Sequence, residues 1–414
     1  MAFDILSRPD AGSAFSHLRQ YMISATCVVL LTITLPPIWS FVLLSSVALL
    51  TSLGSLRGKY YTSLDLAFFA FYLSSCVSTV FAYDITTALP QLYLRTLFLL
   101  LYLTLRSWGT SMPDIIVASG IGMIIHCIES FVLFSTHYHE WVTLHFSRLV
   151  DFRSFVTLTT HTQRPGNHAA IYLIAIAIGL YRLSGDRNTS RVIVSICLLS
   201  VWMSTACVVL SLSRGLYVST LICLLMSTCA LTKTLSLRSR AVVIIGACAA
   251  IMIVVSCLLF VRPVMDAVID VTLSNIRLSQ KRSIHGRLSV NTTALHLIPQ
   301  SGMFGAGVGN YALAIRRGGL DTPSMLTVHA FNTALEVTIE QGFVGLAILV
   351  VALVELTRIL VKRLRTGPGY VLLGGATALL LYSLSQTYVI ADQATAVLFA
   401  LFCATVVNDG DRHA

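Results

Sequence analysis

The sequence predicts an all-α, polytopic membrane protein with about twelve transmembrane helices and one large loop on the outer side of the membrane. Three observations support this fold class. Hydrophobic residues make up 56% of the chain and charged residues only 11%, against roughly 25% charged residues in soluble domains. Apolar runs long enough to cross a bilayer, roughly 17–25 residues, recur along the whole chain. Basic residues gather in alternate connections between these runs.

The expected spans follow one another through mostly short connections. We place them near residues 21–36, 38–54, 64–82, 88–106, 114–134, 168–184, 191–211, 215–232, 241–261, 342–361, 369–386 and 393–408. The first run has no small-residue cleavage site after it, so we interpret it as a retained helix and not as a signal peptide. Residues 1–261 then hold helices 1–9, residues 262–341 the large loop with the candidate site, and residues 342–414 helices 10–12 and a tail.

The distribution of basic residues predicts the orientation, because short cytoplasmic connections carry an excess of lysine and arginine. With the amino terminus in the cytoplasm, one side receives sixteen of these residues, from Arg8 to Arg412, and the short connections of the other side receive only Arg214. Both termini are therefore expected in the cytoplasm. Two longer segments, 135–167 and 262–341, lie outside and are exempt from the rule because of their length.

The outer segments hold cations suited to an anionic ligand such as a diphosphate. Arg214 lies in a very short outer turn, and Arg287 is expected in the first turn of a helix, where backbone N–H groups also favour phosphate. Arg277 and Lys281 share a helix face at four-residue spacing, and Arg164 lies in a turn before the sixth span. The alternative for each cation is contact with lipid headgroups at the membrane surface.

A polar face follows on the segment that leads into the tenth span. His329, Asn332, Glu336 and Glu340 recur at steps of three and four residues, which places them on one face of a helix beginning near His329. The positive end of the helix dipole favours a neutral imidazole, the form that a general base needs. The residues alone leave open whether His329 is a base or only caps the loop by hydrogen bonding.

Three further features need an interpretation. Arg95 lies within the fourth span, where a charge costs about 2.5–3.5 kcal/mol, so we expect it to face a polar interior or the outer interface, with no role assigned. The glycines of residues 305–309 lack the lysine of a phosphate loop and suggest a flexible hinge. No Asp-x-Asp pattern occurs outside, which favours chemistry without a metal, and we expect no other cofactor.

Together these segments resemble the O-antigen ligase and O-antigen polymerase superfamily of bacterial inner membranes. The resemblance rests on motifs that occur in the family's order: Arg164-Pro-Gly-Asn-His-Ala169, Ser211-Leu-Ser-Arg-Gly215, Gly286-Arg287, Pro299 to Tyr311, and His329-Ala-Phe-Asn332 continuing to Gly345. It implies a GT-C-like membrane fold with short helices in a periplasmic loop, and a protein of the bacterial inner membrane whose active site faces the periplasm.

The resemblance also implies an activity and roles for residues. The protein would transfer glycan from undecaprenyl diphosphate to a sugar hydroxyl of lipid A-core, without a metal and with inversion at the anomeric carbon. His329 would be the general base, Arg214 and Arg287 would bind the diphosphate with help from Arg164, and a supporting set would comprise Arg277, Lys281, Asn332, Glu336 and Glu340. The partners are thus a lipid-linked glycan donor, a lipid acceptor and membrane lipids, with no nucleic acid.

Two alternatives stay open. A polymerase of the same superfamily would join one lipid-linked repeat to another; the single large loop and the short spacing from His329 to the next span favour the ligase. A transporter of lipid-linked glycan would form no bond and would need polar residues deep in several spans. The sequence places few there, Arg95 and Glu129 among them.

Overall fold

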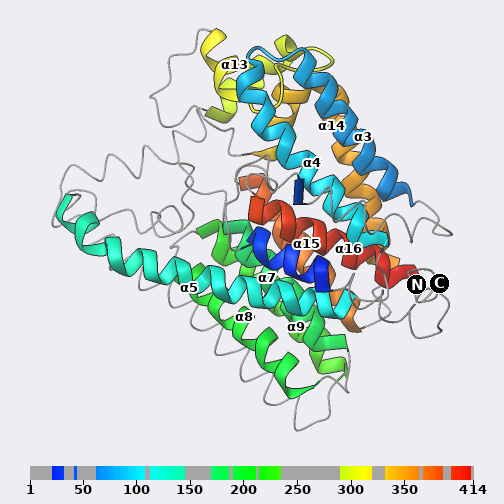
Figure 1. Ribbon diagram of the computed structural model, residues 1–414. Coiled ribbons are helices and arrows are strands. Elements are labelled where there is room, and N and C mark those ends of the chain that lie inside the picture. Colours follow the sequence, from blue (N-terminus) through cyan, green and yellow to red (C-terminus); the bar gives the residue numbers. More distant parts are fainter. Residues whose placement is uncertain are drawn as a thin grey trace, which may run out of the picture.

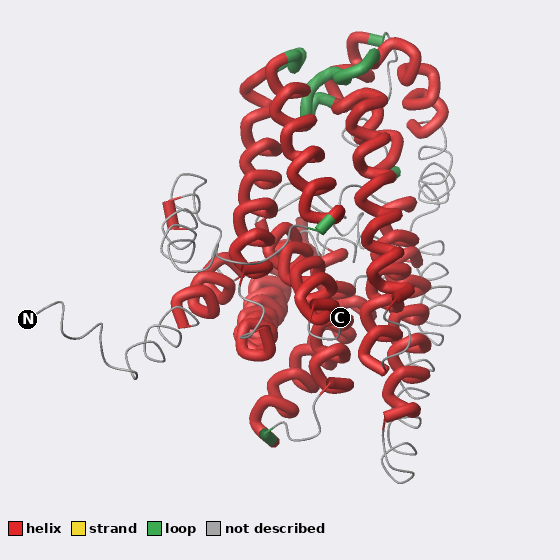
Figure 2. Tube along the Cα trace, turned by 90° about the vertical axis from the view of Figure 1, so that its right-hand side faces the viewer, coloured by secondary structure: helices red, strands yellow, loops and turns green. Residues whose placement is uncertain are grey.

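A computed structural model describes residues 21–31, 42–43, 62–107, 112–144, 169–185, 190–210, 214–234, 290–318, 332–362, 367–385 and 393–411. Every regular element in these ranges is a helix (Figures 1 and 2). The labelled helices are α3 (Ser63–Val80), α4 (Ile85–Ser107), α5 (Met112–Leu144), α7 (Ala169–Gly185), α8 (Arg191–Leu210), α9 (Arg214–Thr234), α13 (Tyr311–Arg317), α14 (Thr333–Lys362), α15 (Gly367–Ser385) and α16 (Gln393–Asp411).

The predicted spans correspond closely to these helices. The ranges 64–82, 191–211 and 369–386, for example, match α3, α8 and α15 to within a few residues. The spans predicted at 38–54, apart from two helical residues, and at 241–261 lie outside the described residues. One boundary is wrong: α5 continues as a helix to Leu144, about ten residues into the stretch assigned to an outer segment.

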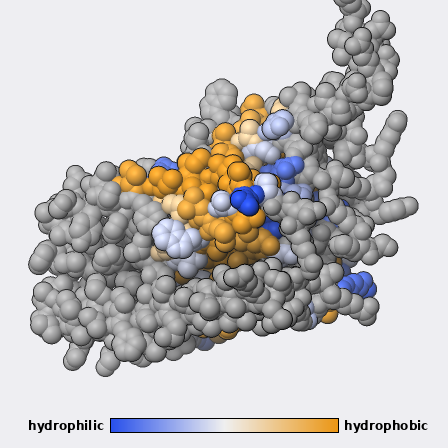
Figure 3. All heavy atoms as spheres, turned by 90° about the horizontal axis from the view of Figure 1, so that it is seen from below, coloured by the Kyte–Doolittle hydropathy of each residue, from blue (hydrophilic) through white to orange (hydrophobic). Residues whose placement is uncertain are grey.

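Within the described residues, four helices are both long and apolar enough to cross a membrane: Ser63–Val80, Ile85–Ser107, Arg191–Val208 and Thr333–Lys362. Several shorter apolar helices accompany them. Large apolar side chains of these helices are exposed, including Leu66, Val192, Trp202 and Val354, and Figure 3 shows apolar side chains gathered over a broad area of one face. Such a surface suits lipid and not water, so the protein is a helical membrane protein with several spans; the number of twelve stays a prediction.

The helices pack in two connected groups. Helix α3 lies against α4 and α14, and α16 packs on α4; α15 joins this group to α7 and α9, with α8 and α5 beyond (Figure 1). Tyr102, Tyr172 and Phe402 are fully buried where these helices meet. A smaller core packs residues 290–301 and α13 onto Ile339 of α14, and this second core lies beside the candidate site.

A buried polar cluster ties α3, α4 and α16 together far from α13. Asp65 caps the start of α3 with Thr62 and also accepts a hydrogen bond from the Tyr102 hydroxyl. The Arg106 Nε atom lies 3.7 Å from the Asp65 carboxylate, and its Nη1 donates to Asn408 at 2.8 Å. In the predicted orientation this end faces the cytoplasm, so the cluster stabilises the bundle at the side opposite the candidate site.

Candidate functional site

Helix α14 is interrupted at Gly342, nine residues after its start at Thr333. The backbone of Gly342 has φ 68° and ψ −167°, which is not helical, and so divides α14 into Thr333–Gln341 and a longer half that continues to Lys362. In an uninterrupted helix each carbonyl would accept from the N–H four residues later. The interruption leaves those groups in need of other partners, inside a protein where an unpaired backbone group is costly.

The turn formed by residues 302–309 supplies the partners. The N–H groups of Ala306 and Gly307 donate to the carbonyls of Ile339 and Glu340, at 2.8 and 3.0 Å. These are the carbonyls that an unbroken helix would pair with residues 343 and 344. The Ser78 hydroxyl of α3 donates to the Glu340 carbonyl as well.

The amide side of the interruption is satisfied in the same way. The N–H groups of Phe343 and Val344 donate to the carbonyls of Gly302 and Met303, at 3.5 and 3.3 Å. The turn therefore provides a partner for each backbone group of the helical bonds that would otherwise join Ile339 to Phe343 and Glu340 to Val344. The two halves of α14 are joined through a segment that lies about thirty residues earlier in the chain.

Glycine is required on both sides of this contact. A Cβ atom on Gly305 would overlap the backbone of Glu340, and one on Gly342 would overlap the carbonyl of Met303. Gly302, Gly305, Gly307, Gly309 and Gly342 all have positive φ, which other residues adopt only with strain. The prediction of a flexible hinge at 305–309 is thus wrong, because the glycines allow the backbone to bond closely to α14.

The same turn is fixed to the connection between α3 and α4. The N–H of Tyr83 donates to the Ala306 carbonyl at 2.9 Å. Asn310 and Asp84 pair reciprocally: the Asp84 N–H donates to Asn310 Oδ1 at 3.0 Å, and Asn310 Nδ2 donates to the Asp84 carbonyl at 3.1 Å. Three parts of the chain therefore meet at the turn: α3–α4, residues 302–310 and α14.

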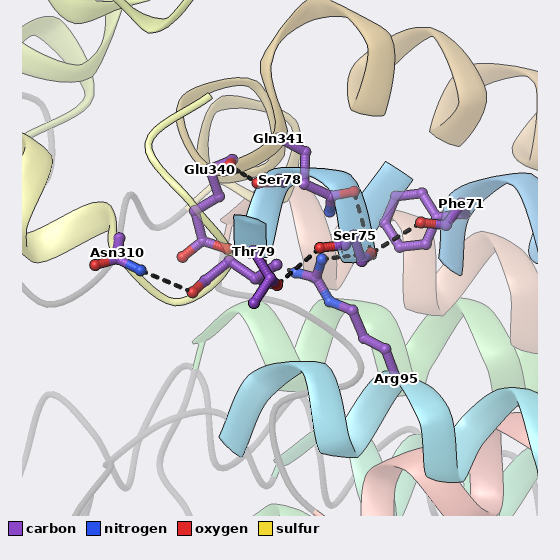
Figure 4. Close-up of polar contacts among 9 residues, drawn as sticks. Phe71, Ser75, Ser78, Thr79, Arg95, Asn310, Glu340 and Gln341 are labelled. Carbon is purple, nitrogen blue, oxygen red and sulfur yellow. Dashed lines mark hydrogen bonds and ion pairs between the residues drawn. The ribbon is translucent and has the colours of Figure 1, made fainter. Parts of the chain in front are cut away.

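A buried ionic contact reinforces this junction (Figure 4). Arg95 of α4 directs Nη2 to the Glu340 carboxylate at 3.5 Å and Nη1 to the Ser75 hydroxyl at 2.8 Å. Ser75 lies 3.3 Å from Gln341 Oε1, and the Arg95 guanidinium lies over the Phe71 ring. Arg95 and Glu340 are 5% and 2% exposed. The expectation that Arg95 faces a polar interior is confirmed, and its partner Glu340 belongs to the predicted polar face.

The first half of α14 begins at Thr333, directly after Asn332, and not at His329. The Asn332 side chain accepts from the N–H groups of Ala334 and Leu335, at 3.0 and 3.3 Å, and its carbonyl accepts from the Glu336 N–H. Asn332 is therefore the N-cap, and His329 precedes it by three residues. The expectation that His329 lies in the first turn of this helix is wrong, and so is the helix-dipole argument built on it. Glu336 and Glu340 do share one buried face.

Tyr311 is a buried polar residue that the sequence did not point to as a site residue. Its side chain is 1% exposed in the small core beside α14. Burial raises the pKa of the phenol, and the carboxylates of Glu336 and Glu340 raise it further. The phenol therefore lies within electrostatic reach of both acidic residues. Its place directly after Asn310 in the glycine-rich motif was the available signal.

Several predicted site residues lie outside the described residues: His329, Arg287, Arg164, Arg277 and Lys281. Arg214 was predicted in a short turn before a span but is the first residue of helix α9, and the description does not extend to its side chain. Asn332, Glu336 and Glu340 are brought together on α14. Among the described residues no group of histidine, cysteine or acidic side chains is arranged to hold a metal ion, and metal independence stays a prediction.

Comparison with known families bears directly on this part of the chain. A family model described as O-antigen ligase matches residues 198–350. This part of the chain is similar to the O-antigen ligase and polymerase superfamily. The matched region runs from α8 through Arg214 and the 302–309 turn into α14, past the break at Gly342. No curated protein sequence matches the chain. The match supports a glycan-processing enzyme activity in general, and the apolar helices indicate a membrane-embedded protein.

Proposed function

We propose that this protein is an inverting, metal-independent O-antigen ligase. It moves O-antigen glycan from undecaprenyl diphosphate to a sugar hydroxyl of lipid A-core, at the periplasmic face of the bacterial inner membrane. The observation that carries the proposal is the family match over residues 198–350, which includes Arg214, Arg287 and His329. The positive-inside pattern supports a periplasmic site, because it assigns the connection before α9 and the 262–341 segment to the outer side.

The reaction is a single displacement. The acceptor hydroxyl oxygen attacks the anomeric carbon of the glycan while the bond from that carbon to the diphosphate oxygen breaks. His329 takes the proton of the hydroxyl, and undecaprenyl diphosphate leaves with the bonding electron pair. No further energy source is needed, because the donor arrives as an activated diphosphate.

The cations stabilise the leaving group. Negative charge develops on the diphosphate as its bond breaks, and fixed guanidinium groups stabilise that charge more than they stabilise the ground state. Arg214 and Arg287 would bind the diphosphate through paired hydrogen bonds, with Arg164 as a helper. A hydrogen bond to a charged group contributes about 1.5–3 kcal/mol.

The first half of α14 follows His329 in the sequence and is itself firmly anchored. Asn332 caps the helix and Glu340 is fixed by Arg95 and by the glycine turn. Catalytic groups must be held close to their reacting geometry, and His329 lies only three residues before this capped, anchored helix end in the sequence, which supports its assignment as the base.

Reconstitution in lipid vesicles tests the proposal. Purified protein is given a lipid-linked glycan donor with or without lipid A-core, and products are separated by mass. We expect glycan joined to lipid A-core only when both substrates are present. Elongation of the donor without the core acceptor would assign the protein to the polymerases, and movement of unaltered donor across sealed vesicles without any product would assign a transporter.

A further inference from the structure

We propose that Arg95 is a positioning residue: through Glu340 it fixes the direction of the first half of α14, the half-helix that follows His329 in the sequence. The catalytic consequence rests on the proposed function, whereas the structural consequence does not. Nothing in the family motifs points to Arg95, which lies in α4, more than a hundred residues before the matched region.

The guanidinium of Arg95 joins three helices at one point. Its two terminal nitrogens donate in different directions, Nη1 to Ser75 of α3 and Nη2 to Glu340 of α14. The planar, rigid fork of arginine fixes the angle between such partners, which a single-point lysine ammonium would not. Figure 4 shows Arg95 reaching from α4 toward Ser75 and Glu340, next to the glycine turn.

Because of the position of Glu340, its contact with Arg95 strongly affects the direction of the half-helix Thr333–Gln341. Glu340 lies two residues before the break at Gly342, so it stands at the base of the half-helix Thr333–Gln341. The N-cap Asn332 is eight residues away, about 12 Å along the axis. A tilt of about 10° at the base would displace the cap by about 2 Å, and a displacement of about 1 Å can cost a reaction about 100-fold.

Stability alone is a weak reason for a buried ion pair. Desolvation of both charges offsets most of their attraction, and apolar pairs of the same volume often stabilise as well or better. What an ion pair adds is a preferred geometry. The backbone bonds of the 302–309 turn already satisfy the broken helix, so the side-chain contact is available to set its angle.

Arg106 offers a matched control on the same helix. It lies about three turns beyond Arg95 on α4 and contacts a buried carboxylate of α3, Asp65, at 3.7 Å. It also bonds to Asn408 of α16. Loss of Arg106 therefore disturbs a buried charge pair of similar kind, but at the end of the bundle away from the glycine turn.

The experiment compares Arg95→Gln, Glu340→Gln, the double variant and Arg106→Gln in the full-length protein, reconstituted in lipid. Amide hydrogen exchange is measured separately for peptides covering residues 332–341 and 343–362, and kcat and donor KM are measured for transfer. Should Arg106→Gln not accumulate in the membrane, Asn408→Ala replaces it, because that change removes one bond of the same cluster.

We expect Arg95→Gln to raise exchange in residues 332–341 but not in 343–362, and Arg106→Gln to leave 332–341 unchanged. In Arg95→Gln and Glu340→Gln we expect kcat to fall about 10-fold or more, with donor KM changed less than about 2-fold. The double variant should lose no more kcat than either single variant, since the effects of two residues in contact are not additive. Unchanged exchange at 332–341 in Arg95→Gln, or equal effects of Arg95→Gln and Arg106→Gln, would overturn the proposal. A wild-type protein without transfer activity whose exchange still responds to Arg95→Gln would reject the proposed function and retain the positioning role.

Discussion

The N–H of Gly307 donates to the carbonyl of Glu340 at 3.0 Å, between residues separated by 33 positions in the chain. This bond belongs to a set in which the 302–309 turn takes the place of helical bonds at the Gly342 break. The arrangement gives a membrane helix two directions without leaving its backbone groups unpaired, which the hydrocarbon environment would penalise. The glycines of the turn therefore reverse the chain and also allow its backbone to bond directly to α14.

Replacing Gly305 tests that arrangement. Gly305 has a positive φ, and a Cβ atom there would also overlap the Glu340 backbone. Gly302 has a similar φ of 65°, but a Cβ atom there would meet open space. We expect Gly302→Ala to cost about 1–3 kcal/mol from backbone strain alone, and Gly305→Ala to cost about 1–3 kcal/mol more from overpacking. Thermal unfolding in detergent compares the two; equal midpoints would argue against tight packing at Gly305.

The Asn332 cap makes a second prediction. Asn332→Ala removes the acceptor of two backbone N–H groups and should cost about 1 kcal/mol of stability. Because Asn332 is only three residues after the proposed base His329 in the sequence, transfer per folded molecule should fall as well. Thr62→Ala removes the comparable cap of α3 and serves as the control: it should lower the unfolding midpoint and leave transfer per folded molecule intact.

Alanine substitutions can distinguish the arginines proposed to hold the diphosphate from other cations of the loop by their effect on the transfer rate. Arg214→Ala and Arg287→Ala should each lower transfer about 10- to 100-fold, the rate equivalent of one charge-assisted hydrogen bond. Arg316, exposed at the end of α13, is the matched control, and Arg316→Ala should have a milder effect. Initial rates at several donor concentrations measure this, and a loss in Arg316→Ala as large as in the other two would point to general attraction of an anionic lipid.

Metal independence has a direct test. We expect reconstituted transfer to continue at full rate after dialysis against a chelator, because a guanidinium pair replaces the divalent ion as the counter-charge of the diphosphate. Loss of transfer in chelator, restored by magnesium or manganese, would contradict this.

The spans could be predicted from the sequence because each depends on its own hydrophobicity. Helices such as α3 and α8 match their predicted ranges for this reason. The break in α14 could not, since it depends on backbone bonds between Gly342's neighbours and a turn about thirty residues away. Without knowledge of that partner, a glycine-rich run looks the same whether it is a hinge or a packed turn.

Likewise, the candidate site could be predicted only where it depends on residues close together in the sequence. The i, i+4 spacing of Glu336 and Glu340 is local information, and both lie on one buried face as expected. Arg95 was recognised as an unusual charge within a span, but its partners Ser75 and Glu340 are separated from it by 20 and 245 positions. The start of α14 was placed too early because Asn332, an ordinary polar residue in sequence, is selected as the cap by the fold.

The central claim is that His329 takes the proton of the acceptor hydroxyl. The most direct measurement is transfer of glycan to lipid A-core by reconstituted His329→Ala, with donor binding and membrane abundance measured on the same preparation. We predict that transfer is abolished while the variant still inserts and still binds the lipid-linked donor. Glycan ligation at close to the wild-type rate would contradict the mechanism and remove the histidine from it.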